Sequence, residues 1–132
     1  MARIVYVNGE FVPENEGKIS IFDRGFLFAD GVYEVTAVIN GKLVDYDPHM
    51  QRLERSLNEL RMGWPCSKDE LKAMHLEMVK RNDLREGIIY MQVTRGAADR
   101  DFKFPKEAKP TLIAFTQAMS LVDNPNARTG VK

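Results

Sequence analysis

The chain has 132 residues, which is enough for one domain with a buried core and short for two. Its 19 basic and 19 acidic residues balance, so no overall positive field would attract nucleic acid or a membrane surface. The single cysteine excludes an internal disulfide and fits a reducing compartment, and the first residues include no apolar stretch long enough for a signal peptide or a membrane span. We therefore expect a cytoplasmic protein that binds neither nucleic acid nor membrane and that functions through a local site.

Two Asn-Gly dipeptides predict tight hairpin turns, because Asn and Gly most readily adopt the positive φ angles that such turns need. Asn8-Gly9 separates two short antiparallel strands at the start of the chain. Asn40-Gly41 joins residues 32–39, which are rich in β-branched side chains, to residues 42–46. Further strands are expected at residues 88–94 and 111–116.

The first predicted helix follows these hairpins. Asp47 is a suitable N-cap, and Pro48 fits the first helical position. Gly63 and Pro65 are expected to stop the helix. Between these limits apolar residues recur at helical spacing, at Met50, Leu53, Leu57 and Leu60.

The second predicted helix opens with a capping box, Ser67-x-x-Glu70, and ends near Asn82. Each helix has one apolar stripe, so both are expected to pack on one face of a mainly antiparallel sheet, which defines an α+β domain. We assign residues 1–118 to this domain. Residues 119–132 are rich in turn formers and are expected to be a connector that leads into the first strand of a second domain.

Three segments carry residues suited to ligand binding. Residues 23–35 combine paired aromatics with two glycines, which is typical of a tight loop that feeds a strand. On the first helix, His49, Arg52 and Ser56 share a stripe beside the apolar one, because residues three and four apart are neighbours on a helix surface. In residues 93–102 a strand runs into a small-residue loop with two arginines, whose planar guanidinium groups match carboxylate and phosphate.

Each segment also has a purely structural interpretation. The first can be an ordinary loop, the helix stripe can be a solvated edge, and the two arginines can be surface residues that pair with Asp99 and Asp101. Other chemistry has less support. No metal site is expected, because His49 and His75 are far apart and Cys66 has no partner at zinc-site spacing. The sequence has no glycine-rich phosphate loop, no dinucleotide fingerprint and no Ser or Cys nucleophile motif.

Taken together and in this order, the three segments resemble the N-terminal domain of the fold-type IV pyridoxal-phosphate enzymes, the class IV aminotransferases. The resemblance rests on Asp23-Arg24-Gly25 through Gly31-Val32-Tyr33-Glu34-Val35, on His49-x-x-Arg52-Leu53, and on Val93-Thr94-Arg95-Gly96. It covers nearly the whole chain. Gly-Val-Tyr-Glu-Val is most similar to D-amino-acid transaminases, whereas branched-chain aminotransferases and aminodeoxychorismate lyases more often have Phe at the position of Tyr33.

The resemblance implies pyridoxal 5'-phosphate as cofactor and a role for several residues. Arg52 resembles the arginine that binds the cofactor phosphate. Tyr33 resembles the tyrosine at the substrate carboxylate, and Arg100 resembles the arginine that reaches this carboxylate from the neighbouring subunit, which implies a homodimer. Amino acids such as D-alanine and 2-oxo acids are the implied substrates. Further residues that the resemblance places at the active-site lining are Val35, His49 and Phe102.

The sequence departs from the family pattern in three respects. Phe102 stands where D-amino-acid transaminases often have histidine, and Ala29 stands where glycine is usual. The lysine that holds the cofactor as a Schiff base, and the glutamate that pairs with its pyridine nitrogen, are expected beyond Lys132, so residues 1–132 alone are expected to be inactive. The alternatives are a branched-chain aminotransferase or an aminodeoxychorismate lyase on the same scaffold, or a non-catalytic anion-binding domain if the chain naturally ends at Lys132.

Overall fold

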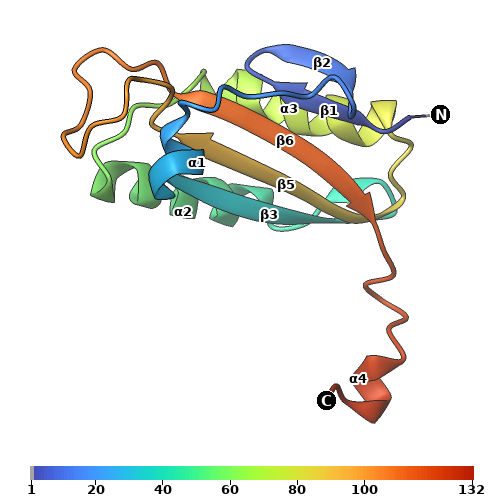
Figure 1. Cartoon of the computed structure of the whole chain (residues 1–132). Coiled ribbons are helices and arrows are strands. Elements are labelled where there is room, and N and C mark those ends of the chain that lie inside the picture. The colour runs from blue at the N-terminus through green and yellow to red at the C-terminus, as the bar shows by residue number, and fades with distance from the viewer. Residues whose placement is uncertain (1) are drawn as a thin grey trace.

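A computed structural model of the chain describes residues 2–132 and has an α+β architecture (Figure 1). Its six-stranded sheet has the order β2-β1-β6-β5-β3-β4, and every pair of neighbouring strands is antiparallel. The elements in chain order are β1 (Ile4–Val7), β2 (Glu10–Pro13), α1 (Arg24–Phe28), β3 (Gly31–Ile39), β4 (Lys42–Leu43), α2 (Tyr46–Glu59), α3 (Lys68–Arg81), β5 (Glu86–Thr94), β6 (Thr111–Ala118) and α4 (Asn126–Thr129).

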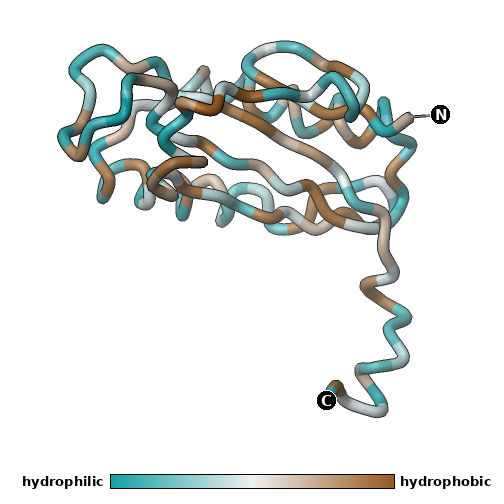
Figure 2. The backbone as a smooth tube through the Cα atoms, viewed as in Figure 1, coloured by the Kyte–Doolittle hydropathy of each residue, from teal (hydrophilic) through white to brown (hydrophobic). Residues whose placement is uncertain are grey.

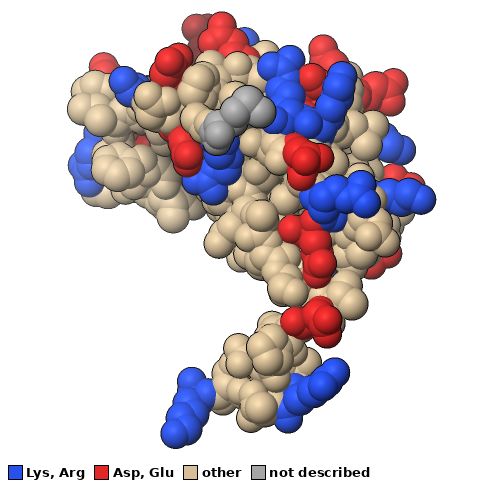
Figure 3. Space-filling view, turned by 90° about the vertical axis from the view of Figure 1, so that its right-hand side faces the viewer, with Lys and Arg blue, Asp and Glu red and all other residues tan. Residues whose placement is uncertain are grey.

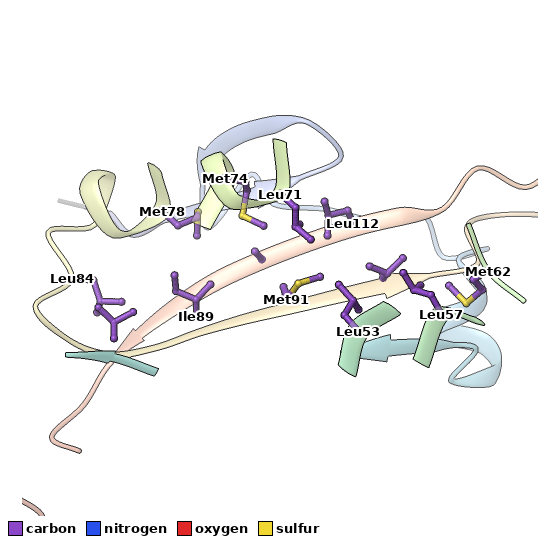
Figure 4. Packing of buried hydrophobic residues seen from close by; sticks show 13 residues of the cluster. Leu53, Leu57, Met62, Leu71, Met74, Met78, Leu84, Ile89, Met91 and Leu112 are labelled. Atoms are coloured by element: carbon purple, nitrogen blue, oxygen red, sulfur yellow. The ribbon is translucent and has the colours of Figure 1, made fainter. Parts of the chain in front are cut away.

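The core lies between one face of this sheet and the helices α2 and α3 (Figure 4). Strand β5 alternates between the two sides, with Ile89, Met91 and Val93 fully buried against the helices. Leu53 and Leu57 from α2 pack on the same cluster, as do residues Leu71, Met74 and Met78 from α3. Hydrophobic residues accordingly concentrate along the strands, while the loop between β5 and β6 is largely hydrophilic (Figure 2). The predicted fold class, a mainly antiparallel sheet with two helices on one face, is confirmed.

Neither α2 nor α3 covers the opposite face of the sheet, where only the short helix α1 lies near the ends of β3 and β5 (Figure 1). A row of aromatic rings crosses this open face: Tyr33 of β3 stacks on Tyr90 of β5 at 5.4 Å between ring centroids, and Tyr90 stacks on Phe115 of β6 at 5.0 Å. Tyr33 is 62% exposed. Strand β3 therefore presents Tyr33 on the open face and the next residue, Glu34, on the helix face.

Several local predictions are confirmed. Both Asn-Gly pairs adopt positive φ angles, with Asn8 at 49°, Gly9 at 100°, Asn40 at 51° and Gly41 at 70°. The capping box at Ser67 is complete, because its hydroxyl accepts from the Glu70 amide and the Glu70 carboxylate accepts from the Ser67 amide. Charges of both signs are intermixed over the face shown in Figure 3, consistent with the balanced composition. Within residues 2–132 no helix has the length and apolar character needed to cross a membrane.

Four boundaries differ from the prediction. Residues 24–28, expected as loop, form α1, because the Asp23 side chain accepts from the Gly25 amide and caps a short turn of helix. Ala29 ends this helix in the left-handed region at φ 53°, which explains why glycine is usual there. Helix α2 starts at Tyr46 rather than after an Asp47 cap and ends at Glu59, before Gly63.

The other two differences lie in β4 and at the end of the chain. Strand β4 has only two residues instead of the five predicted. The residues after β6 form the short helix α4 instead of the start of a strand, and none of its side chains is buried. The assignment of residues 119–132 to a connector and a second domain stays a prediction.

Candidate cofactor and substrate site

A hydrogen-bonded network joins β3 to α2 around Glu34, which is buried and only 2% exposed. The Glu34 carboxylate accepts from Nε and Nη2 of Arg52, at 2.7 Å each, and from Nδ1 of His49 at 2.7 Å. An ionised carboxylate only accepts, so Nδ1 of His49 carries the proton. Burial raises the pKa of Glu34, but the hydrogen bonds and charges of Arg52 and His49 outweigh it, so the pKa lies below its ordinary value. His49 and Arg52 are therefore more than solvated side chains, because both are paired with the buried Glu34 carboxylate, although Arg52 stays largely exposed.

Arg52 is held on one side only. Its side chain is 65% exposed, and Nη1 has no hydrogen-bond partner within residues 2–132. The residue borders an open cavity of about 380 Å³ that is also lined by His49, Pro48 and Asp45. On its other side it borders a second cavity of about 410 Å³ that Ser56 and Arg55 help to line. A guanidinium locked by a buried carboxylate, with free N–H groups at a cavity, is suited to bind a phosphate.

Tyr33 and Val35 lie on the open face of the sheet, on the same strand as Glu34 but on its other side. The Tyr33 ring rests on Tyr90, and most of its surface is accessible. Val35 is half-buried and opposite Tyr90 in the strand register. One three-residue stretch thus serves both faces: Glu34 orients Arg52 behind the sheet, and Tyr33 and Val35 form part of its front surface.

A second network fixes the start of β3 to the loop after β5. The Asp30 carboxylate accepts from Nε of Arg24 at 2.8 Å and from Nε and Nη2 of Arg95 at 2.7 and 3.1 Å. Arg24 also donates to the carbonyl oxygen of Asp101 at 2.8 Å. Burial raises the pKa of Asp30, but the hydrogen bonds from Arg95 and Arg24 more than offset this, and the pKa lies below its ordinary value. The sequence did not reveal this network, although all its side chains come from two of the selected segments.

Arg100 lies on the loop that this network fixes. Its guanidinium carbon lies over two rings, 5.2 Å from the centroid of Phe28 and 5.1 Å from that of Phe102. Within residues 2–132 it forms no ion pair, so the predicted alternative of a pairing with Asp99 or Asp101 is wrong. Within residues 2–132 the Arg100 guanidinium neither lies over the Tyr33 ring nor donates a hydrogen bond to Tyr33.

Glycine is required in the Arg95-Gly96 motif for a geometric reason. Gly96 has a φ of 106°, and a Cβ atom there would overlap the carbonyl oxygen of Lys109. Both backbone polar groups of Gly96 are hydrogen-bonded. Its amide donates to the Thr94 hydroxyl at 3.1 Å, and its carbonyl oxygen accepts from the Arg24 amide at 2.9 Å. The motif therefore holds two loops together at the edge of the site.

The charged groups that face the Glu34 and Asp30 carboxylates are arginines and a histidine. Within residues 2–132 there is no group of His, Cys, Asp and Glu side chains that would hold a metal ion. No lysine takes part in the hydrogen bonds of the Glu34 or Asp30 networks in this part of the chain.

Comparison with known proteins places this arrangement in a family. The family model described as amino-transferase class IV matches residues 31–131. The D-alanine aminotransferase of Staphylococcus aureus (strain MSSA476) is 41% identical over 115 residues, which are 86% of this chain and 41% of that protein. The D-alanine aminotransferase of Bacillus licheniformis is 39% identical over 112 residues, 85% of this chain and 40% of that protein. The chain thus spans about two fifths of the length of these relatives.

Solved structures share the fold at low sequence identity. The branched-chain amino acid aminotransferase of Escherichia coli superposes with a TM-score of 0.85 at 20% identity, covering 96% of this chain and 43% of that one. The 4-amino-4-deoxychorismate lyase of Pseudomonas aeruginosa gives 0.72 at 24% identity, covering 96% of this chain and 44% of that one. At these identities the likeness concerns the fold alone. The family model and the shared architecture together establish that this chain belongs to the class IV aminotransferase family.

Proposed function

We propose that the chain is the N-terminal part of a pyridoxal-phosphate-dependent aminotransferase that acts on D-amino acids, such as D-alanine, and on 2-oxo acids. The observation that carries this proposal is the Arg52 guanidinium, held by buried Glu34 with free N–H groups at a cavity. Its support from relatives is the D-alanine aminotransferase of S. aureus.

The residues present fit the phosphate of the cofactor. A phosphate carries close to two negative charges and three acceptor oxygens, and a guanidinium with unoccupied N–H groups can donate to those oxygens and supply a positive charge beside them. Bound pyridoxal 5'-phosphate would supply an electron sink for breaking a bond at the substrate α-carbon. This chain would hold the phosphate through Arg52, with His49 at the rim of the same cavity.

The substrate carboxylate would be bound on the open face of the sheet. Tyr33 offers an exposed phenol there, and Val35 adds an apolar surface beside it. Because Arg100 lies over Phe28 and Phe102 and not over Tyr33 in one chain, we propose that it reaches the carboxylate from the partner subunit of a homodimer. A buried carboxylate needs such a cationic partner, since an unpaired one is costly.

We propose that residues 1–132 alone are inactive, because the lysine for covalent attachment of the cofactor lies beyond Lys132. The chain mixed with pyridoxal phosphate and reduced with borohydride should then show only sparse labelling, spread over several exposed lysines. Mass spectrometry that finds one lysine labelled stoichiometrically would refute this expectation.

The phosphate assignment is tested in the full-length protein with Arg52→Ala. The variant should lose on the order of 2–3 kcal/mol of affinity for pyridoxal phosphate, the scale of a lost charge-assisted contact, which is about 30- to 150-fold in Kd. Pyridoxal, which has no phosphate, should bind both proteins alike. Arg55→Ala is the matched control, because Arg55 is exposed on the same helix and lies outside the Glu34 network. Equal losses from both substitutions would show general damage to the helix and contradict the assignment.

A lyase on the same scaffold remains the second candidate, and the observation that favours it is Phe102, which removes the histidine typical of D-amino-acid transaminases. Release of pyruvate from aminodeoxychorismate without a 2-oxo-acid acceptor would establish the lyase. Transfer of the amino group from D-alanine to a 2-oxo acid would establish the aminotransferase.

A further inference from the structure

Arginine and phenylalanine side chains alternate in a stack at the edge of the site. Each guanidinium carbon lies within 6 Å of the centroid of each ring that it contacts, which is the range of cation–π attraction. We call this row the Arg–Phe stack; in order it consists of Arg95, Phe104, Arg24, Phe28, Arg100 and Phe102. The successive distances are 4.1, 5.6, 4.6, 5.2 and 5.1 Å.

One end of the stack is anchored in the protein. Arg24 and Arg95 are nearly buried and share the Asp30 carboxylate, and Arg95 also donates to the carbonyl oxygen of Leu60 at 2.9 Å. Phe28 belongs to α1, which Asp23 caps, so its ring is carried by a defined element. The backbone of Phe28 is therefore held by the hydrogen bonds of α1 and its cap.

The other end of the stack is accessible. Phe102, the last ring of the row, is 79% exposed. Arg100 contacts both Phe28 and Phe102, whose ring centroids are 6.0 Å apart, so the two neighbouring rings lie on the same side of the guanidinium group. Arg100 donates no side-chain hydrogen bond within residues 2–132. Cation–π contacts occupy the π-faces of the rings and leave all five N–H groups of the guanidinium free for an anion.

These two ring contacts have an energetic consequence for binding. A free arginine side chain samples many rotamers, and ordering it on binding weakens affinity. Contact with two neighbouring rings restricts the side chain before the ligand arrives, while its charge is not neutralised by a carboxylate of the protein itself. Asp99 and Asp101 are close in sequence, yet neither forms an ion pair with Arg100.

We propose that Phe28 and Phe102 are positioning residues that hold Arg100 ready to bind the carboxylate of the amino-acid substrate. This inference rests on the proposed function, in which Arg100 contacts that carboxylate. It assigns a role to Phe28, and it gives Phe102 a function that differs from the hydrogen-bonding role of a histidine. The site would consequently depend on the charge of a pre-ordered arginine for carboxylate recognition.

The test uses the full-length protein with Phe28→Leu, Phe102→Leu and the double variant. The KM for D-alanine should rise about two- to fivefold for each ring and about tenfold for both, the scale of exposed cation–π contacts, while kcat changes little. The inhibition constant of propionate, which has the carboxylate but no amine, should rise in parallel. Turnover of a simple amine without a carboxylate should stay unchanged, and Phe102→Tyr, which keeps the ring, should behave like the wild type.

Phe26→Leu is the matched control, because Phe26 lies on the same short helix and is 69% exposed, and within residues 2–132 no Lys or Arg side chain lies over its ring. In an Arg100→Ala background, Phe28→Leu and Phe102→Leu should add no further effect, since the interaction that they support is already absent.

The outcomes separate this inference from the proposed function. If Arg100→Ala raises KM for D-alanine but the two ring variants change it no more than Phe26→Leu, the positioning role is wrong and the carboxylate assignment stands. If Arg100→Ala itself leaves KM unchanged, the carboxylate assignment falls, and the positioning role falls with it. An equal rise in KM for D-alanine and for the amine would show general loop damage and would also overturn the inference.

Discussion

Replacing Asp30 by asparagine should open the edge of the site, because this carboxylate is the shared partner of two nearly buried guanidinium groups. The side chains of Arg24, Asp30 and Arg95 are 5%, 10% and 12% exposed. An asparagine keeps one oxygen for the two Nε donors but must turn its amide NH₂ toward Nη2 of Arg95, so that donor faces donor. It also leaves both positive charges without a negative partner.

Breaking a fully buried ion pair costs about 3–5 kcal/mol, and the slight exposure of this group lowers our expectation to about 2–4 kcal/mol. We expect the lost free energy to make local opening between α1 and the loop after β5 easier. The amides of Arg24, Arg95 and Ala98 report this opening, because they donate to backbone carbonyls across the junction. Hydrogen exchange of peptides with these amides should accelerate by at least about 30-fold, the equivalent of 2 kcal/mol.

Asp99→Asn is the control, because it makes the same charge change at an exposed position of the same loop without breaking an ion pair. Acceleration of less than about threefold in Asp30→Asn, or an equal change in both variants, would refute this account of the network. The pKa of Asp30 lies below its unfolded value of 3.8, so in the wild type this stabilisation is complete above about pH 4 and is lost as pH falls through the folded pKa.

Two further predictions follow from single buried positions. Gly96→Ala should destabilise the loop by several kcal/mol, because Gly96 has a positive φ and a Cβ atom there would overlap the Lys109 backbone. Gly63→Ala is the control, since nothing lies near a Cβ atom at that position, and equal urea unfolding midpoints for the two variants would contradict the prediction. Burial lowers the pKa of fully buried His75, helped by the charge of His49 and opposed by the carbonyl of Leu71. On acidification the unfolded state, with a pKa of 6.5, therefore takes up a proton before the folded state does, and stability should fall between pH 7.5 and 5.5, by at most about 1.4 kcal/mol. His75→Leu should remove this pH dependence, so equal losses in both proteins would count against it.

Local sequence signals determined the secondary structure because their physical causes are local. The Asn-Gly turns and the Ser67 capping box each depend on residues within four positions of one another, and both are formed as predicted. Residues 88–94 were likewise predicted as a strand from their composition, and they lie within β5. The three motifs that resemble class IV aminotransferases are also continuous in sequence, so the family was recognisable before the fold was known.

Tertiary structure decided which side chains meet. Glu34 lies between Tyr33 and Val35 in one motif, but only the packing of α2 on β3 brings its carboxylate to Arg52 and His49, 18 and 15 residues away. Asp30 meets Arg95 across 65 residues, a pairing that no spacing rule contains. The short helix α1 was also hidden, since its five residues are too few to show a period and depend on a cap and on long-range contacts. The sequence identified the residue types for binding anions, whereas the partners that orient these residues come from long-range packing.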